Sequence, residues 1–322
     1  MSSRFRPRRR PGPVALAAAL LGSLCAAACT SGAAAPQPQQ LTLWSGIAPG
    51  FTNDLIRRFN RELLHVRIGL RPTSGGVVAV SAVDSGEGQL GLAQSDVVYI
   101  AYRRGIEKNL YPHKNLRAIA VLWVNNLHVL VRRDSPFQSI ESLKGRRVGI
   151  IPPGTSGEFS TRIVLDAHGM SYADVRPIFE PTGSLVPRLA AGQIDAVFSA
   201  NPILLNAVAQ TVPLRLLPVD RAVINELRGS YPFLKPVTIA ANQLNGQHEP
   251  IETLGAEWLL VCRSDLSEDL VYQLTRTFIE QLPAMAGAYG EAALIDPEQA
   301  PAAPIPLHPG AARYYREREI LR

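Results

Sequence analysis

Apolar and polar positions alternate along this chain with two periods, one typical of β-strands and one typical of α-helices. Residues 66–71 have an apolar residue at every second position, as in a strand, whereas residues 53–64 repeat their apolar positions at helical spacing. Strand-like and helix-like segments follow each other at 41–44, 53–64, 66–71, 77–85, 90–93 and 97–103. This alternation predicts an α/β fold, with a mostly parallel sheet flanked by helices.

A second series of strands and helices follows two β-rich segments, 116–123 and 127–132. Gly169 and Gly192 mark the ends of two of its helices, because glycine commonly follows the last helical turn. The expected elements are a one-turn helix at 140–145, strands at 147–151, 175–179 and 196–199, and helices at 158–168 and 185–191. The segments that lead back to the first series are 214–218, 222–228, 237–240, 257–262 and 268–282.

The length of the chain predicts two lobes, because roughly 280 residues beyond the leader exceed what one hydrophobic core usually fills. We expect residues 41–130 to begin lobe I, 131–238 to form lobe II, and 239–322 to complete lobe I and form the tail. The chain would cross between the lobes near 127–132 and again near 237–241. The tail is proline-rich from Pro297 and ends in a charged segment, which we expect on the surface.

Residues 1–28 have the pattern of an export signal, in which five arginines precede an apolar run at 14–24 that is too short to span a bilayer comfortably. Three alanines then precede Cys29. This arrangement resembles the lipobox of bacterial lipoproteins, in which the cysteine is acylated; ordinary cleavage with an incidental Cys29 is the alternative. We expect an exported protein, periplasmic or at the outer cell surface, with residues 29–40 as a flexible tether to a membrane lipid anchor.

Removal of this signal changes the charge of the chain. The formal net charge is +6, and the signal carries five arginines and no acid, so the mature chain is near +1. A nucleic-acid partner therefore has little electrostatic support. Of the three cysteines, Cys25 lies in the signal and Cys262 in an apolar run, so we expect no internal disulfide and a buried Cys262.

Polar loops repeatedly follow a strand and open a helix, at 72–76, 94–96, 153–158, 182–184 and 199–202. The helix dipole and the unpaired backbone N–H groups of a helix start favour an anionic group at such places. The alternative is that Ser, Thr and Asp only cap the helices there. Glu158 has a third option, since an acid in the first turn can stabilise its own helix.

Catalytic and metal-binding patterns are absent from the sequence. The histidines have no metal-ligand spacing, and no nucleophile, base and acid can be assembled from a known motif. Residues 86–91 match the dinucleotide fingerprint in letters, but they connect a helix to a strand, which is the reverse of the required context. We therefore expect no cofactor, no metal and no catalytic residues.

Several blocks of residues, in this order over nearly the whole mature chain, resemble the TAXI solute-binding proteins, the extracytoplasmic receptors of TRAP transporters. The resemblance implies a type II periplasmic-binding-protein fold with two α/β lobes, a two-crossover hinge and a ligand in the cleft. Its ligands would be small organic acids or amino-acid-like solutes, and its partners TRAP membrane subunits. The blocks lie at 72–76, 92–96, 101–102, 115–120, 142–145, 153–158, 192–196, 231–233, 237–239, 305–311 and 314–315.

Two departures from the family lie where we expect the pocket. The first loop, 45–51, contains one aromatic residue where the family usually has paired tyrosines. Ser184 stands where the family often has a glutamate. Both differences put the usual family ligand in doubt without affecting the expected fold.

The expected ligand contacts come from the polar loops and from aromatic residues at strand ends. Trp44 and Trp123 could equally pack under a loop. A sensing module or an enzyme on the same fold is the alternative function, with Asp96 and Glu158 as its only candidate acids or bases. The full set of expected ligand-binding residues is Trp44, Ser45, Phe51, Thr73, Ser74, Gly75, Gly76, Gln94, Ser95, Asp96, Trp123, Thr155, Ser156, Gly157, Glu158, Ser184 and Asn201.

Overall fold

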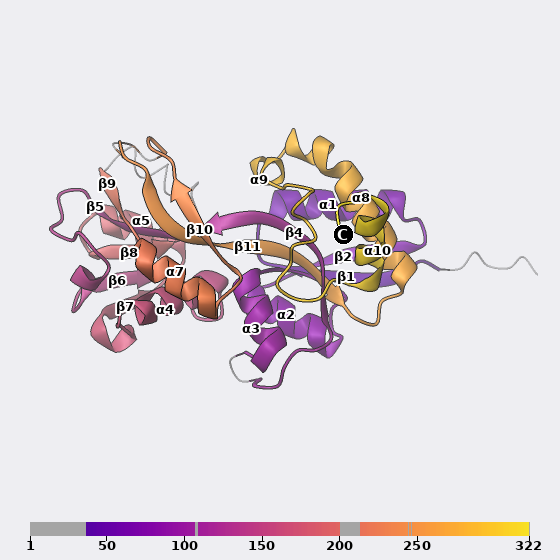
Figure 1. The fold of residues 1–322 in the computed structure, drawn as a ribbon, viewed down its shortest axis with the longest axis horizontal. Coiled ribbons are helices and arrows are strands. Elements are labelled where there is room, and N and C mark those ends of the chain that lie inside the picture. Colours follow the sequence, from indigo (N-terminus) through magenta and orange to yellow (C-terminus); the bar gives the residue numbers. More distant parts are fainter. Residues whose placement is uncertain (1–36, 107–108, 200–212, 244, 246, 322) are drawn as a thin grey trace, which may run out of the picture. The chain divides into compact units, whose positions relative to one another are not determined.

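The computed structural model describes residues 37–106, 109–199, 213–243, 245 and 247–321. The expected signal peptide, Cys29 and Asn201 lie outside the described residues. Residues 38–322 form one compact unit. It contains two sheets with flanking helices, which confirms the expected two-lobed α/β fold (Figure 1).

The first sheet combines parallel and antiparallel strands. Parallel pairing joins β1 (Gln39–Ser45) to β2 (Val66–Pro72) and to β3 (Leu90–Gln94). The long strand β11 (Ile251–Arg263) runs antiparallel to β3, β4 (Leu116–Asn126) and β10 (Leu234–Ile239). Its helices are α1 (Pro49–Glu62), α2 (Gly76–Ser85), α3 (Ser95–Arg104), α8 (Glu268–Ala286), α9 (Gly290–Ala293) and α10 (Pro309–Glu317).

The second sheet has the strand order β7-β6-β8-β5-β9. Parallel pairing joins β6 (Arg147–Ile150) to β7 (Arg176–Phe179) and to β8 (Ala196–Ser199), whereas β5 (His128–Arg132) is antiparallel to both β8 and β9 (Leu214–Leu217). The helices of this lobe are η1 (Glu141–Leu143), α4 (Ser156–Ala167), η2 (Tyr172–Asp174), α5 (Thr182–Ala190) and α7 (Arg221–Ser230).

Both sheets are therefore mixed, but all described strands except one in each sheet point the same way, in agreement with the expected mostly parallel sheets. Each βαβ unit gives a parallel pair, as the alternation of elements requires. The strands that run against the others are β11 in the first sheet and β5 in the second, and each is antiparallel to its neighbours. Hydrophobic periodicity identifies a strand but does not give its direction, which depends on the connections.

The two strands that link the sheets lie side by side (Figure 1). β4 continues into β5 through Leu127, whose N–H donates to the Leu254 carbonyl at 2.8 Å, while Thr253 Oγ1 donates to the Leu127 carbonyl at 2.7 Å. β11 contributes Leu254 to the core of the second lobe and Trp258 to the core of the first. The second passage thus lies within β11, further along the chain than the expected segment 237–241, which belongs to the β10–β11 hairpin.

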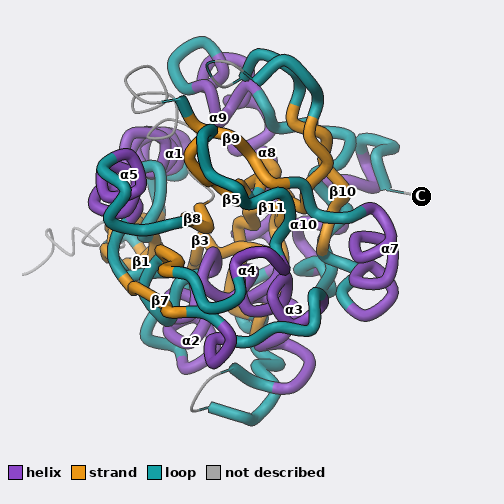
Figure 2. Tube along the Cα trace, turned by 90° about the vertical axis from the view of Figure 1, so that its left-hand side faces the viewer, coloured by secondary structure: helices purple, strands orange, loops and turns teal. Residues whose placement is uncertain are grey.

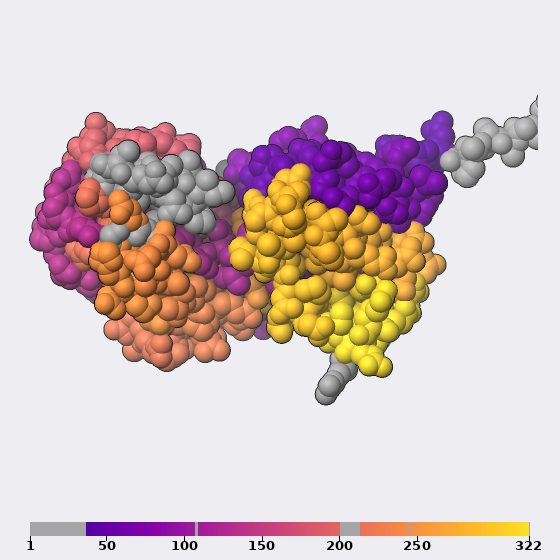
Figure 3. Space-filling view, turned by 90° about the horizontal axis from the view of Figure 1, so that it is seen from above, coloured from indigo at the N-terminus to yellow at the C-terminus, as the bar shows by residue number. Residues whose placement is uncertain are grey.

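The tail is part of the first core, so its expected surface position was wrong for α10. Tyr314 and Tyr315 are buried, and the Tyr315 hydroxyl donates to the Ile119 carbonyl at 3.0 Å. Arg313, on the outer side of α10, forms ion pairs with Glu268 and Asp269 of α8. The charged residues concealed an amphipathic helix, and the N-terminal and C-terminal parts of the chain consequently lie together in one lobe (Figure 3).

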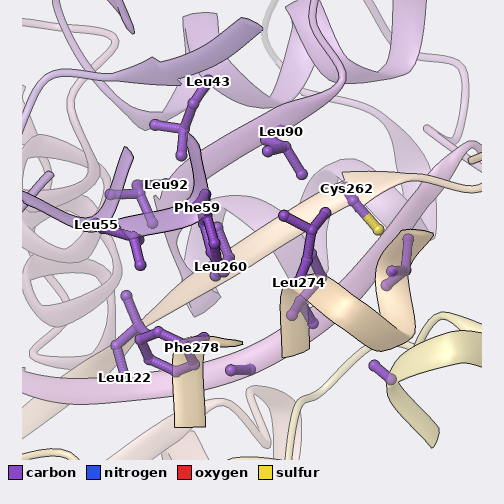
Figure 4. Close-up of a cluster of buried hydrophobic side chains, with 14 of the residues drawn as sticks. Leu43, Leu55, Phe59, Leu90, Leu92, Leu122, Leu260, Cys262, Leu274 and Phe278 are labelled. Carbon is purple, nitrogen blue, oxygen red and sulfur yellow. The ribbon is translucent and has the colours of Figure 1, made fainter. Parts of the chain in front are cut away.

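The core of the first lobe joins residues from β1, α1, β3, β11 and α8 (Figure 4). Phe59, Leu260 and Leu274 are fully buried in it. Cys262 is also buried there, as expected, and burial raises the pKa of its thiol. The expected tether ends two residues early, because Gln39 and Gln40 pair with β2.

Candidate functional site

Two of the polar loops meet between the sheets. Loop 73–76 follows β2 and opens α2, and loop 151–155 follows β6 and opens α4. A Cβ atom on Gly75 would lie 2.7 Å from the Gly154 carbonyl oxygen, and one on Gly76 would lie 2.9 Å from Ser156 Oγ. The two helix N-termini therefore approach each other at a distance that only glycine permits at these positions.

Ser156 provides the polar group with no partner at this meeting point. Its side chain is 5% exposed, and its Oγ has no hydrogen-bond partner among the described residues. Thr155 Oγ1 donates to the Pro152 carbonyl at 2.7 Å and accepts from the Glu158 N–H, so it caps α4. Thr73 Oγ1 similarly donates to the Gly75 carbonyl at 3.1 Å. A buried hydroxyl without a partner loses its hydration, so Ser156 is suited to bind a group that enters from outside.

The first loop lies against loop 73–76. The Thr73 N–H donates to the Ser45 carbonyl at 3.1 Å, and a Cβ on Gly46 would lie 2.5 Å from the carbonyl oxygen of Thr73. Ser45 Oγ itself bonds within the loop, to the main chain of Ile47. The carboxyl ends of β1 and β2 thus bring two of the expected segments to one edge of the sheet.

The third polar loop, at the start of α3, ties the lobes together. Ser160 Oγ of α4 donates to Asp96 Oδ2 at 2.7 Å, and the Val97 N–H donates to Oδ1 at 2.7 Å. Ser95 Oγ accepts from the Glu257 N–H at 3.1 Å and donates to the Phe233 carbonyl at 3.4 Å. Burial raises the pKa of Asp96 from an ordinary 3.8 to about 6, against the opposing effect of these hydrogen bonds.

Glu158 points away from the meeting point of the loops. Its Oε1 accepts a hydrogen bond from the Tyr172 hydroxyl at 2.7 Å and lies 2.9 Å from Arg162 Nε. Ser156 and Ser160 are four residues apart and share one face of α4, whereas Glu158 and Arg162 share the opposite face. Helical phase therefore directs the carboxylate away from the expected pocket.

Two of the three aromatic residues that were expected to cover a ligand, Phe51 and Trp123, are buried in the first lobe, and Trp44 is half-buried. Phe51 is 1% exposed and packs edge-on against Trp123, with ring centroids 5.2 Å apart. Trp44 packs against Gly88 and lies under the guanidinium of Arg71. The structure therefore brings Phe51 and Trp123 together, and it places Trp44 in a separate contact.

Other expected residues are dispersed. Ser184 is exposed in the first turn of α5, and Ser74 is exposed in its loop. Gln94 and Gly157 line a cavity of about 10 Å³ beside Leu127 and Ser160, which has room for about one water molecule. Sequence reasoning missed Ser160, whose only sequence signal is its position one helical turn after Ser156.

Among the described residues, no group of three or more His, Cys, Asp or Glu side chains could hold a metal ion. The isolated His128 is buried at the start of β5, and burial lowers its pKa to about 4. Over the same described residues, no helix is both long enough and apolar enough to cross a membrane.

Two mixed sheets joined by paired strands, with helix N-termini facing each other between them, define the fold of the periplasmic solute-binding proteins. The chain belongs to the NMT1-like family, whose model matches residues 54–318.

Solved structures support this fold. The alkanesulfonate-binding protein SsuA from Xanthomonas axonopodis pv. citri, bound to MOPS, superposes with a TM-score of 0.50 at 17% identity, covering 89% of this chain and 95% of that one. A Xanthomonas citri protein bound to ATP has a TM-score of 0.53 at 11% identity, covering 88% of this chain and all (100%) of that one. At these identities the similarity establishes the fold.

A relative among curated proteins is similar over a short segment. A Brucella abortus (strain 2308) chain named as a binding protein is 36% identical over 77 residues. These residues make up 24% of this chain and 24% of that relative, so the match spans about a quarter of the relative's length.

Proposed function

We propose that this protein is an exported receptor that binds a small organic solute with an anionic group and delivers it to a membrane transporter. The observation that carries the proposal is the meeting of loops 73–76 and 151–155 around the buried Ser156 hydroxyl. N–H groups at two helix starts and a hydroxyl are the donors that recognise a carboxylate or a similar anion without a metal. The expected solute is therefore a small carboxylate or amino-acid-like compound.

The contact between the loops corresponds to a closed arrangement of the two lobes. Gly75 and Gly154 already touch, so a solute can enter only if the two lobes separate. The strands β4 and β11 are the two connections that would bend in such a motion, since both pass between the cores. The solute would then be enclosed between α2 and α4 when the lobes close.

The two candidate acids are occupied by structural contacts, which favours a receptor over an enzyme. Asp96 accepts from Ser160, and Glu158 is held by Tyr172 and Arg162. A general acid or base must reach the group that it protonates or deprotonates. Asp96 is 0% exposed and Glu158 is 3% exposed, so neither carboxylate is accessible to a solute in this arrangement.

The transporter would be of the TRAP type, and the receptor a member of the TAXI class. Support comes from the sequence blocks, two of which, the loops 72–76 and 153–158, meet in the structure. Acylated Cys29 would anchor the protein to a membrane, and several acyl chains are needed for a stable anchor. Replacing Cys29 with Ala would then move the protein from the membrane fraction to the soluble fraction, whereas unchanged partitioning would contradict the anchor.

A calorimetric screen tests the receptor function. Amino acids, dicarboxylates and short keto acids are titrated into the purified protein, and each hit is incubated to measure turnover. We expect saturable binding of one anionic class, a higher melting temperature with the ligand, and no product. The altered first loop and Ser184 predict a solute other than the amino acids typical of the family. Tight glutamate binding would contradict that specificity, and turnover would contradict the receptor.

A further inference from the structure

A second and larger cavity lies on the other face of α4. Its volume is about 500 Å³, and Phe159, Arg162 and Tyr172 contribute to its lining together with Arg104 of α3. Pockets that enclose small molecules usually measure about 300–1,000 Å³. The cavity is therefore large enough for a compound the size of an aromatic amino acid.

Helix α4 separates this cavity from the cleft between the loops. Gly157, Ser160 and Val164 line the small cavity on the cleft side, and Phe159, Arg162 and Asp166 line the large one. Each residue of the second set follows its counterpart in the first by two positions, which turns it by about 200° around the helix axis. A ligand in the large cavity would therefore be distinct from the transported solute.

The aromatic wall of the cavity is held in place by buried contacts. Glu158, which is 3% exposed, fixes the Tyr172 hydroxyl at 2.7 Å and Arg162 Nε at 2.9 Å. The Arg162 guanidinium lies over the Phe159 ring at 5.3 Å, and the Tyr172 ring packs edge-on against Phe179. A wall that is already ordered costs little to organise around a ligand, so it suits a flat apolar ring.

Two opposite charges remain without a partner at the edge of the cavity. The side chains of Arg104 and Asp166 line the cavity and make no hydrogen bond or ion pair to the described residues, and both residues are exposed. Arg162 is already neutralised by Glu158. The remaining charge pattern is therefore one cation from α3 and one anion from α4, two helices that pack against each other (Figure 2).

We propose that this cavity is a second binding site for a zwitterionic aromatic compound, of the class of the aromatic α-amino acids. The aromatic ring would occupy the space beside Phe159 and Tyr172. The carboxylate would pair with Arg104 and the ammonium group with Asp166. Arg104 comes from the first lobe and Asp166 from the second, so the site is complete only when α3 and α4 are in contact.

Calorimetry with L-tryptophan as the probe tests this site, with two matched analogues. Indole-3-propionate lacks the ammonium group, and tryptamine lacks the carboxylate. We expect saturable tryptophan binding, with both analogues weaker by about tenfold or more, since a hydrogen bond to a charged group contributes about 1.5–3 kcal/mol. Absence of tryptophan binding would overturn the proposal, and equal binding of either analogue would overturn the zwitterionic class.

Variants locate the site. Arg104→Gln and Asp166→Asn should each weaken tryptophan about tenfold or more, while Arg103→Gln, a neighbour on α3 that lies over Tyr99, should not. Both target residues are exposed, and a melting curve checks that each variant folds. Ser156→Ala, which removes the hydroxyl of the cleft without obstructing lobe closure, should leave tryptophan binding unchanged. Loss of tryptophan binding in Ser156→Ala would assign the ligand to the cleft and overturn the second site.

Discussion

The starts of α2 and α4 differ from the start of α3, although all three are polar loops that follow a strand. At α2 and α4 the glycine-rich loops touch, and the Ser156 hydroxyl has no partner among the described residues. At α3 the side chains of Ser95 and Asp96 are both paired with groups of other elements. The same sequence pattern thus provides a ligand-binding surface in one place and a structural connection in the other. The two places differ in one respect: among the described residues the buried Ser156 hydroxyl has no hydrogen-bond partner, whereas the side chains of Ser95 and Asp96 do.

The largest expected effect follows from obstructing the loops that touch. In Gly75→Val the new side chain would collide with the Gly154 carbonyl, so the lobes could not close on a solute. The backbone of Gly75 is extended, with φ 168°, so the substitution causes no local strain. We expect the affinity for the solute to fall by about a thousandfold or more, or about 4 kcal/mol, as measured by calorimetry.

The matched control for this variant is Gly69→Val on β2, where a Cβ would meet nothing within 4 Å. Its affinity and stability should resemble those of the unmodified protein. Solute binding by Gly75→Val with ordinary affinity would show that the loops do not enclose the ligand.

The second expected effect concerns the pH dependence of stability at the start of α3. The folded protein holds the Asp96 proton more tightly than the unfolded chain does, because burial raises its pKa to about 6. Stability from this group is therefore greatest at low pH, and it falls as the pH rises from about 4 to about 6, by about 3 kcal/mol. Asp96→Asn should remove this fall in urea unfolding experiments.

Asp195→Asn is a control of opposite sign. Arg147 lowers the pKa of Asp195 through its hydrogen bonds, so that group contributes stability that is lost as the pH falls. If Asp96→Asn and the unmodified protein show parallel pH profiles, Asp96 is not titrating in a buried site.

The sequence predicts which loops exist but not what each one contacts. Loops 73–76 and 153–156 were identified because helix starts after strands expose N–H groups, a property that is local in the chain. The bond between Asp96 and Ser160 joins residues 64 positions apart in different lobes, and no local pattern reports it. Similarly, the strands near 120 and 257 were recognised, but their antiparallel pairing depends on long-range packing.

Helical phase explains the remaining differences. Glu158 and Ser156 are two positions apart on α4, so they face opposite sides, and Tyr172 reaches Glu158 from a later segment. Tyr314 and Tyr315 lie among arginines, and only their packing against β4 and α8 shows that α10 is part of the core. The spacing of Ser156 and Glu158 and the two tyrosines of α10 are visible in the sequence, but only the three-dimensional contacts show which side of each helix is buried.

A third test asks whether Ser95 is structural. In Ser95→Ala the Glu257 N–H and the Phe233 carbonyl would each lose a buried partner. We expect the free energy of unfolding to fall by about 1–2 kcal/mol, with no change in affinity for the solute. Ser85→Ala, at the exposed end of α2, is the control and should leave the stability unchanged. A loss of affinity without a loss of stability in Ser95→Ala would make the α3 start a ligand contact.

The smallest expected effect reverses that pattern at the start of α4. In Ser156→Ala a buried hydroxyl without a partner is removed, so the free energy of unfolding should be unchanged or slightly higher, because its desolvation no longer has to be offset. The solute would lose one charge-assisted hydrogen bond, worth about 1.5 kcal/mol, or about a tenfold loss of affinity. Calorimetry and urea unfolding on the same preparation measure both quantities. A destabilised variant with ordinary affinity would mean that Ser156 serves the fold, as Ser95 does, and the contrast between the two helix starts would disappear.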